Sequence, residues 1–172
     1  MASFGLGRTD ATGNAAAAGT NEPMDASTPW VAAADGNLPL LQAALQALQL
    51  PVTAQDENGY TLLQAAVSYN QAHIWNWLAT QPHFTVSAVD TEGDSALHYA
   101  GTAAAAQFLV EQQPGGMDLT TIRNQENQTA LEKKRQELEE MRQDEDFDET
   151  DDEYVQLVGM VEYLSNLSTM SQ

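Results

Sequence analysis

The amino-acid sequence predicts an all-α helical solenoid of about four stacked repeats, with degenerate first and last units. The first observation is one leucine per unit at a constant spacing of 34 residues: Leu63, Leu97 and Leu131. The second is a hydroxyl residue two positions before each leucine: Thr61, Ser95 and Thr129. The third is that apolar residues between these segments trace helical faces. Because a unit of this size cannot bury its apolar face alone, the units are expected to stack.

Each unit is expected to contain two short helices separated by turn residues. Thr61 and Ser95 are suited to cap a helix, because a hydroxyl oxygen accepts a hydrogen bond from a free backbone N–H. Thr129 and Glu132 have the spacing of a capping box. A glycine stands two positions before each of the first two caps, where the turn needs a backbone that other residues resist. The predicted helices are residues 30–34, 39–50, 61–69, 72–80, 95–100, 103–112 and 154–167, with one more opening at residue 129.

Composition divides the chain into five expected segments. They are a disordered N-terminal tail (1–26), the repeats (27–143), an acidic loop (144–153), a closing helix (154–167) and a disordered C-terminal tail (168–172). The first segment is rich in Ala, Gly, Thr and Asn without an apolar period. The closing helix is apolar at most positions, so it is expected to fold back on the stack and to bury Val158 there.

The charge of the chain is strongly acidic and unevenly distributed. It has 25 acidic and six basic residues, a formal net charge of −19, and no lysine or arginine between Arg8 and Arg123. Residues 144–153 hold eight acids in ten positions. Such a surface repels phosphate backbones and anionic lipid, so nucleic-acid and membrane partners are not expected. It favours a protein partner with a basic segment, although the charge could also serve solubility alone.

Cysteine usage and hydropathy indicate a cytoplasmic and/or nuclear protein. The chain has no cysteine, so it has no disulfide framework and no thiolate metal site. It lacks an apolar run of membrane-spanning length and an apolar secretory region at its N-terminus. The chain is expected to be monomeric when free.

Helix, turn, helix and a hairpin bearing Asp-x-x-Gly-x-Thr resemble the ankyrin repeat. The similarity covers about residues 27–167, and the best match is Ser95-Ala96-Leu97-His98-Tyr99-Ala100. The proline of the family pattern is replaced by Leu62, Ala96 and Ala130. With its acidic segment near the end, the chain also resembles a set of small, chiefly fungal, ankyrin-repeat proteins. The resemblance implies an ankyrin-repeat helical solenoid that binds another protein.

The ankyrin resemblance places partner contacts at the hairpin tips and at the exposed ends of the first helices. By position these residues are Glu57, Asn58, Tyr60, Ser68, Tyr69, Thr91, Glu92, Asp94 and Glu126, flanked by Ala34, Asp35, Gln125 and Gln128. Tyrosine provides contact area and a hydrogen bond at a low entropic cost. The alternative is a solvated face with incidental tyrosines.

No catalytic, metal or cofactor site is predicted, and the chain is not expected to be an enzyme. His73 and His83 have no partners at metal-ligand or triad spacing, and His98 occupies the position where the family's histidine braces neighbouring turns. The function expected is a non-enzymatic adaptor or regulatory subunit that binds a basic partner. The alternative is a dedicated chaperone of a highly basic client, such as a ribosomal protein or histone, by analogy with another small ankyrin protein.

Three further features carry hypotheses. Thr150 precedes Asp151-Asp152-Glu153, the pattern that acidophilic kinases prefer, which predicts phosphorylation. The basic run at 133–135 is expected to pair with the acids that follow it within one helix, rather than to serve nuclear import. Trp75 aligns with the core, whereas Trp77 is expected to pack against a loop or, less favoured, to face a partner.

Overall fold

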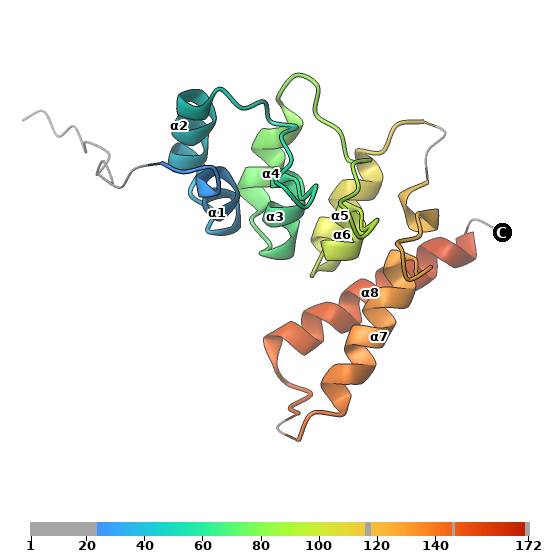
Figure 1. Cartoon of the computed structure of the whole chain (residues 1–172). Helices are drawn as coiled ribbons and strands as arrows, with labels where there is room; N and C mark the ends of the chain where they lie inside the picture. Colours follow the sequence, from blue (N-terminus) through green and yellow to red (C-terminus); the bar gives the residue numbers. More distant parts are fainter. Residues whose placement is uncertain (1–23, 116–117, 146, 171–172) are drawn as a thin grey trace, which may run out of the picture.

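The computed structural model describes residues 24–115, 118–145 and 147–170, which form a stack of paired helices (Figure 1). In chain order the pairs are α1 (Thr28–Ala34) with α2 (Leu38–Leu48), α3 (Leu62–Ser68) with α4 (Ala72–Ala79), α5 (Ala96–Tyr99) with α6 (Ala103–Glu111), and α7 (Ala130–Arg142) with α8 (Asp152–Met170). A short 3-10 helix, η1 (Leu119–Thr121), precedes the third hairpin. The described residues contain no strand, only isolated bridges such as Gln55–Thr61. The all-α solenoid prediction is confirmed, whereas most of the predicted N-terminal tail lies outside the described residues.

A capping residue starts the first helix of a unit, as the spacing predicts. The Thr61 hydroxyl accepts from the backbone N–H of Gln64 at 3.1 Å, and the Gln64 side chain accepts from the Thr61 N–H at 2.7 Å. Thr129 and Glu132 repeat this reciprocal pair at the start of α7. Each box satisfies backbone donors that a helix start would otherwise leave unpaired.

The third residue of α3 and of α5 also joins its unit to the next one. Gln64 donates from Nε2 to the carbonyl of Asp94 at 2.8 Å, and His98 occupies the equivalent position in α5. His98 Nδ1 lies 3.2 Å from the Ser95 backbone nitrogen, whose N–H donates to it, so the proton resides on Nε2. That Nε2 donates to the Gln128 carbonyl at 3.1 Å. His98 therefore acts as a brace between units, as the family pattern predicts.

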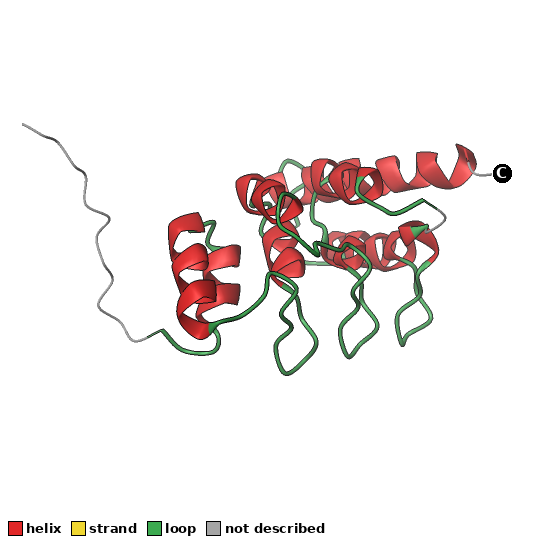
Figure 2. Cartoon of the chain, turned by 90° about the horizontal axis from the view of Figure 1, so that it is seen from above, coloured by secondary structure: helices red, strands yellow, loops and turns green. Residues whose placement is uncertain are grey.

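Three hairpins, residues 55–61, 89–95 and 123–129, project side by side from one edge of the stack (Figure 2). Gly59 and Gly93 take φ values of +75° and +79° in the first two. A Cβ on Gly59 would lie 3.1 Å from the backbone Cα of Asp90, and one on Gly93 would lie 3.1 Å from that of Asn124. Glycine is thus required at both positions by conformation and by the close approach of the next hairpin.

Helix α8 closes the stack by packing against α6 and α7. Its buried stripe consists of Leu157, Met160 and Leu164, spaced three and four residues apart. The expectation that Val158 is buried is wrong, because the helix turns this side chain toward a partly exposed position. Helix α8 is also longer than the predicted 154–167. Asp152 and the following acid form its first turn, where carboxylates favour the positive end of the helix dipole, and residues 168–170 continue the helix instead of forming a disordered tail.

Candidate functional site

The hairpin tips form a connected row. The carboxylate of Asp56 accepts from two backbone N–H groups of its own turn, at 2.9 and 2.8 Å, and Asp90 does the same in the next hairpin. Neighbouring tips are joined by backbone hydrogen bonds of 2.8 Å, from Thr91 N–H to the Asn58 carbonyl and from Gln125 N–H to the Glu92 carbonyl. The row is therefore held by its backbone.

Most of the predicted contact residues lie on this row or beside it. The exposed members are Glu57, Asn58, Tyr69, Thr91, Glu92 and Glu126, with Asp35 and Gln125 from the flanking set. Tyr60, Ser68, Ala34 and Gln128 are partly buried. Tyr69 is 64% exposed.

Tyr60 is as much a structural side chain as a surface one. Its ring lies edge-on to the ring of Tyr99, with centroids 5.0 Å apart, and its hydroxyl lies 3.2 Å from the Ser68 hydroxyl. The carbonyl of Tyr60 accepts from the Trp30 indole at 2.7 Å. Burial raises the pKa of Tyr60 above its ordinary value. Its replacement would therefore disturb the stack as well as the surface.

Asp94 is not available to a partner, which corrects its place among the predicted contact residues. The residue is only 4% exposed. One carboxylate oxygen accepts from the Asn124 side chain at 2.8 Å, and the other pairs with the ammonium of Lys133. A buried carboxylate needs such partners to offset its loss of hydration. Asp94 thus links the third unit to the fourth.

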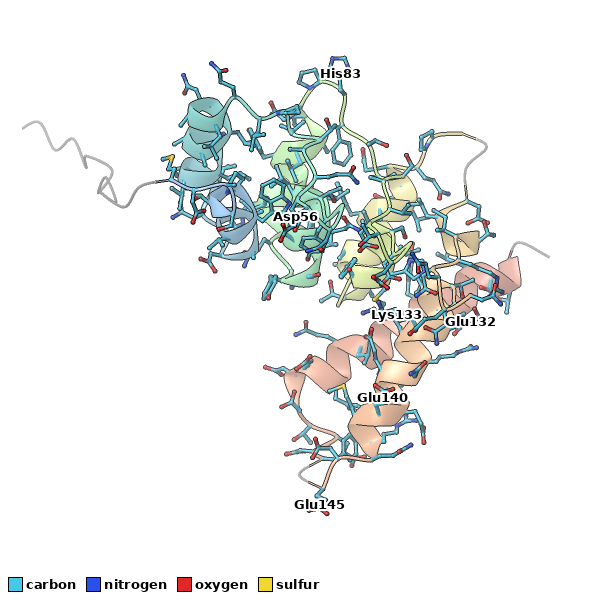
Figure 3. All side chains as sticks on the ribbon, viewed as in Figure 1. Asp56, His83, Glu132, Lys133, Glu140 and Glu145 are labelled. Carbon is cyan, nitrogen blue, oxygen red and sulfur yellow. The ribbon has the colours of Figure 1, made fainter. Side chains whose placement is uncertain are left out.

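The three residues of the basic run at 133–135 make different contacts. Lys134 pairs with Glu137 at 2.7 Å within α7, as predicted. The prediction is wrong for Lys133, which reaches back to Asp94 and places its ammonium 5.3 Å from the centroid of the Tyr99 ring. Arg135 donates to the Ser165 hydroxyl of α8 at 3.0 Å. In Figure 3 Lys133 lies where α7 meets the hairpins, close to Glu132.

Tyr99 is a site residue that the sequence reasoning missed. Its hydroxyl donates to Asp90 at 2.6 Å, and burial, together with that carboxylate, raises its pKa far above the ordinary tyrosine value. The available signal was the 34-residue period, which places Tyr99 in register with Lys133 of the next unit. Together with Tyr60 these side chains make one continuous aromatic and cationic row across three units.

Trp77 packs rather than projecting freely. The side chain is partly buried against the core, and it borders an apolar hollow of about 370 Å³ between the second and fourth helices. Leu45, Leu50, Val52 and Pro82 line the same hollow. Trp75, by contrast, is fully in the core, as predicted.

Helices α7 and α8 and the loop between them form a helical hairpin, called the arm below. The arm extends past the ends of α3 and α5, and Glu145 lies at its far end (Figures 1 and 3). The ring of Phe147 in the loop lies edge-on to the ring of Tyr154, with centroids 4.9 Å apart. Arg142 donates to the Tyr154 hydroxyl from Nε at 3.1 Å and from Nη2 at 3.0 Å. The acidic loop is therefore anchored by an aromatic contact. Thr150 is exposed there, and its hydroxyl donates to Asp148 at 2.7 Å.

A groove of about 290 Å³ lies where the arm meets the ends of the inner helices. It is lined by Ser68, His98, Tyr99, Gly101, Lys133, Lys134, Glu137, Glu153 and Leu157. A second hollow of about 260 Å³, near the end of the arm, is lined by Met141, Asp144, Phe147, Asp148, Asp151 and Glu153. Glu153 borders both, so the two hollows are neighbours.

The described part of the chain contains neither a metal-binding cluster nor a membrane-spanning helix. No group of three or more His, Cys, Asp or Glu side chains there has an arrangement that could hold a metal ion. No helix within the same residues is long and apolar enough to cross a membrane.

Comparison with known proteins gives the family of the chain. The family model described as ankyrin repeats (3 copies) matches residues 29–123, which is more than half of the 172 residues. A comparison with curated proteins found no match. The matched residues include the first three helix pairs and two of the three hairpins described above. The chain therefore belongs to the ankyrin-repeat family.

Proposed function

We propose that this ankyrin-repeat protein is a non-enzymatic adaptor or regulatory subunit that binds a basic segment of a partner protein. The family supports the general role, because ankyrin repeats are protein–protein interaction modules. The proposal goes further in naming the charge of the partner and in assigning binding, without catalysis, as the whole activity. A cytoplasmic or nuclear location belongs to the same proposal and is supported by the absence of cysteine.

The observation that carries the proposal is that most of the few basic residues are already paired with carboxylates of the same chain. Of the five basic residues that the structure describes, four form ion pairs within the chain: Arg123 with Glu132, Lys133 with Asp94, Lys134 with Glu137, and Arg142 with Glu139. The exposed tips carry carboxylates at Glu57, Glu92 and Glu126. The surface potential is consequently negative over the repeats, and a negative surface accelerates encounter with a cationic partner.

The test is affinity capture of partners by the full-length protein, followed by mass spectrometry and by binding measurements with the purified partner. We expect a partner with a lysine- or arginine-rich segment whose deletion removes binding. A charge-reversed variant with lysine at Glu57, Glu92 and Glu126 is expected to slow association. A partner that lacks a basic segment and binds this variant normally would contradict the proposal.

A chaperone for a highly basic client is the second candidate, and the acidic loop favours it. Glu145 of this loop lies at the end of an arm that projects from the stack, where it can contact a mobile basic chain (Figure 3). A client held mainly by charge should be released steeply between low and moderate salt. A partner held by the aromatic row should instead dissociate slowly at both salt concentrations.

Phosphorylation of Thr150 is proposed as a regulator of this charge. The exposed hydroxyl precedes three acidic residues and stands two positions before the start of α8. Transfer of the γ-phosphoryl group of ATP to Oγ1 would add about −1.5 to −2 charge. Phosphoproteomics of the native protein should find this modification, and Thr150→Ala should lower the association rate with the partner. An unmodified Thr150 under all growth conditions would remove the regulator from the proposal.

A further inference from the structure

We propose that the groove at the base of the arm and the acidic hollow near its end form one docking surface for a short basic amphipathic helix. The inference rests on the proposed function and deepens it by naming the surface and the form of the partner segment. Residues of the repeats and of the acidic loop both contribute to this surface.

The buried stripe of α8 reaches the groove at its N-terminal end. Leu157, Met160 and Leu164 face the stack, and Glu153 lies one turn before Leu157 on the same side of the helix. The later part of this stripe is covered by α6 and α7. At Leu157 and Glu153 the stripe instead borders the groove, opposite Ser68 and Gly101. Because Leu157 is only 5% exposed, the part of α8 that lies open at the groove is mainly the exposed residue Glu153.

The groove offers aromatic contacts within a lining that is otherwise mainly polar and charged. Tyr99 and Leu157 line it, and Tyr69, which follows Ser68 in the chain, is 64% exposed. Gly101 adds no side chain to the groove, which leaves its floor close to the backbone. Tyrosines held on a rigid stack provide contact area with little loss of entropy, which is typical of binding hot spots.

The surface has an excess of negative charge. Lys133 and Lys134 are the cations of the groove, and both already pair with carboxylates of the chain. Among the described residues no ion pair uses Glu153. Beyond it, the acidic hollow presents further carboxylates around Met141 and Phe147. A lysine or arginine is complementary to this hollow, since its aliphatic stem packs on the two apolar side chains while its cation meets the carboxylates.

The surroundings of the groove indicate the secondary structure of the partner segment. A strand would need the open edge of a sheet, and the described residues have only isolated bridges in the hairpins. A groove between helices instead suits an amphipathic helix, which lays an apolar face into it. The partner helix therefore carries an apolar stripe for Tyr69 and Tyr99 and, one or two turns along, arginines or lysines for Glu153 and the acidic hollow.

The probe for this surface is a fluorescent helical peptide of about 16 residues, near the length at which isolated helices become stable. It carries a leucine stripe at one end and arginines at the other. One control peptide has the same composition in scrambled order, and a second has glutamate in place of arginine. We expect only the first to bind the full chain tightly, and to shift the backbone amide NMR signals of Ser68, Gly101 and Glu153 more than those of Gly59 and Gly93.

Two pairs of variants locate the binding. Gly101→Leu should fill the groove and weaken binding about tenfold, because its backbone φ suits any residue and a Cβ there meets only the Ser68 carbonyl, at 3.7 Å. Gly115→Leu is its control, since Gly115 has no atom near its Cβ position. Glu153→Lys should weaken binding more than Glu57→Lys, although both make the same change in net charge.

The outcomes separate the inference from the function on which it rests. If Glu57→Lys removes binding while Glu153→Lys and Gly101→Leu do not, the partner binds the hairpin row, so the groove is wrong but a basic partner remains. Equal losses for Glu57→Lys and Glu153→Lys, together with equal binding of the scrambled peptide, indicate diffuse attraction and also overturn the groove. Failure of every arginine-containing peptide to bind, even at low salt, counts against the basic partner itself.

Discussion

Replacing His98 with alanine or with glutamine separates its hydrogen bonds from its charge. The ring is fully buried, accepts from Ser95 and donates to the Gln128 carbonyl. Alanine leaves both backbone groups without these partners, at about 1–3 kcal/mol each, and leaves a cavity as well. We expect His98→Ala to lower the free energy of unfolding by about 3–5 kcal/mol.

Glutamine should keep both hydrogen bonds, because the chain already uses it in this way one unit earlier. Gln64 accepts from the Thr61 N–H at 2.7 Å and donates to the Asp94 carbonyl at 2.8 Å. We expect His98→Gln to stay within about 1 kcal/mol of the wild type at neutral pH. Urea denaturation followed by circular dichroism measures both variants. Equal losses for alanine and glutamine would show that ring packing, rather than the hydrogen bonds, makes His98 important.

The two side chains should differ in their response to pH. Burial lowers the pKa of His98 below its ordinary value of 6.5; Asp94 acts in the opposite direction, whereas Lys133 and Lys134 add to the lowering. The unfolded chain therefore binds the proton at a higher pH than the folded chain does. The stabilisation is complete above the unfolded pKa and is lost as pH falls through the folded pKa. Between about pH 7.5 and pH 5.5 the wild type should lose more stability than His98→Gln, and equal losses would refute this reasoning.

Three further predictions concern glycine positions and the closing helix. Gly159→Ala should raise the free energy of unfolding by about 0.5–1 kcal/mol, because Gly159 lies inside α8 and a Cβ there meets no atom within 4 Å; a loss measured by urea denaturation would contradict the open position. Gly93→Ala should lower it by about 1–3 kcal/mol, since φ is +79° and Asn124 is close; a neutral result would mean that the hairpins can separate. Met160→Asp should lower the free energy of unfolding by several kcal/mol, because it buries an unpaired charge. Val158→Asp, at a partly exposed position of the same helix, is the control and should have a smaller effect. Equal effects would show that α8 does not close the stack through this stripe.

Much of the fold could be predicted because its determinants are local and repeat. A hydroxyl cap, a turn glycine and a leucine at one interval place the first two hairpins and the helices α3 and α5 within a residue or two. The face of α8 could not be placed in this way, because apolar residues occur around most of that helix. The positions of α6 and α7 decide that Met160 is buried and that Val155 is 54% exposed.

The candidate surface was less predictable because it depends on contacts between units. Position within a hairpin correctly placed Glu57 and Glu92 on the surface. The same reasoning placed Asp94 there, since nothing near it in the sequence shows that Lys133, 39 residues later, folds onto it. The groove depends in addition on the lengths of helices, because the 13-residue α7 extends beyond the four-residue α5.

The irregular last unit has a physical cause in the end of the hairpin row. Gly59 and Gly93 are each followed by a hairpin whose backbone excludes a side chain, whereas Asn127 takes the same left-handed conformation, φ +63°, where no further hairpin follows in the described chain. Asparagine tolerates that conformation without needing the space. The third residue of the first helix changes in the same way. Gln64 and His98 each donate a hydrogen bond to a carbonyl of the next unit, whereas Glu132 in the last unit accepts from Arg123 at 2.7 Å. The apparent degeneracy of the last unit in the sequence is thus the loss of two requirements that only a following repeat imposes.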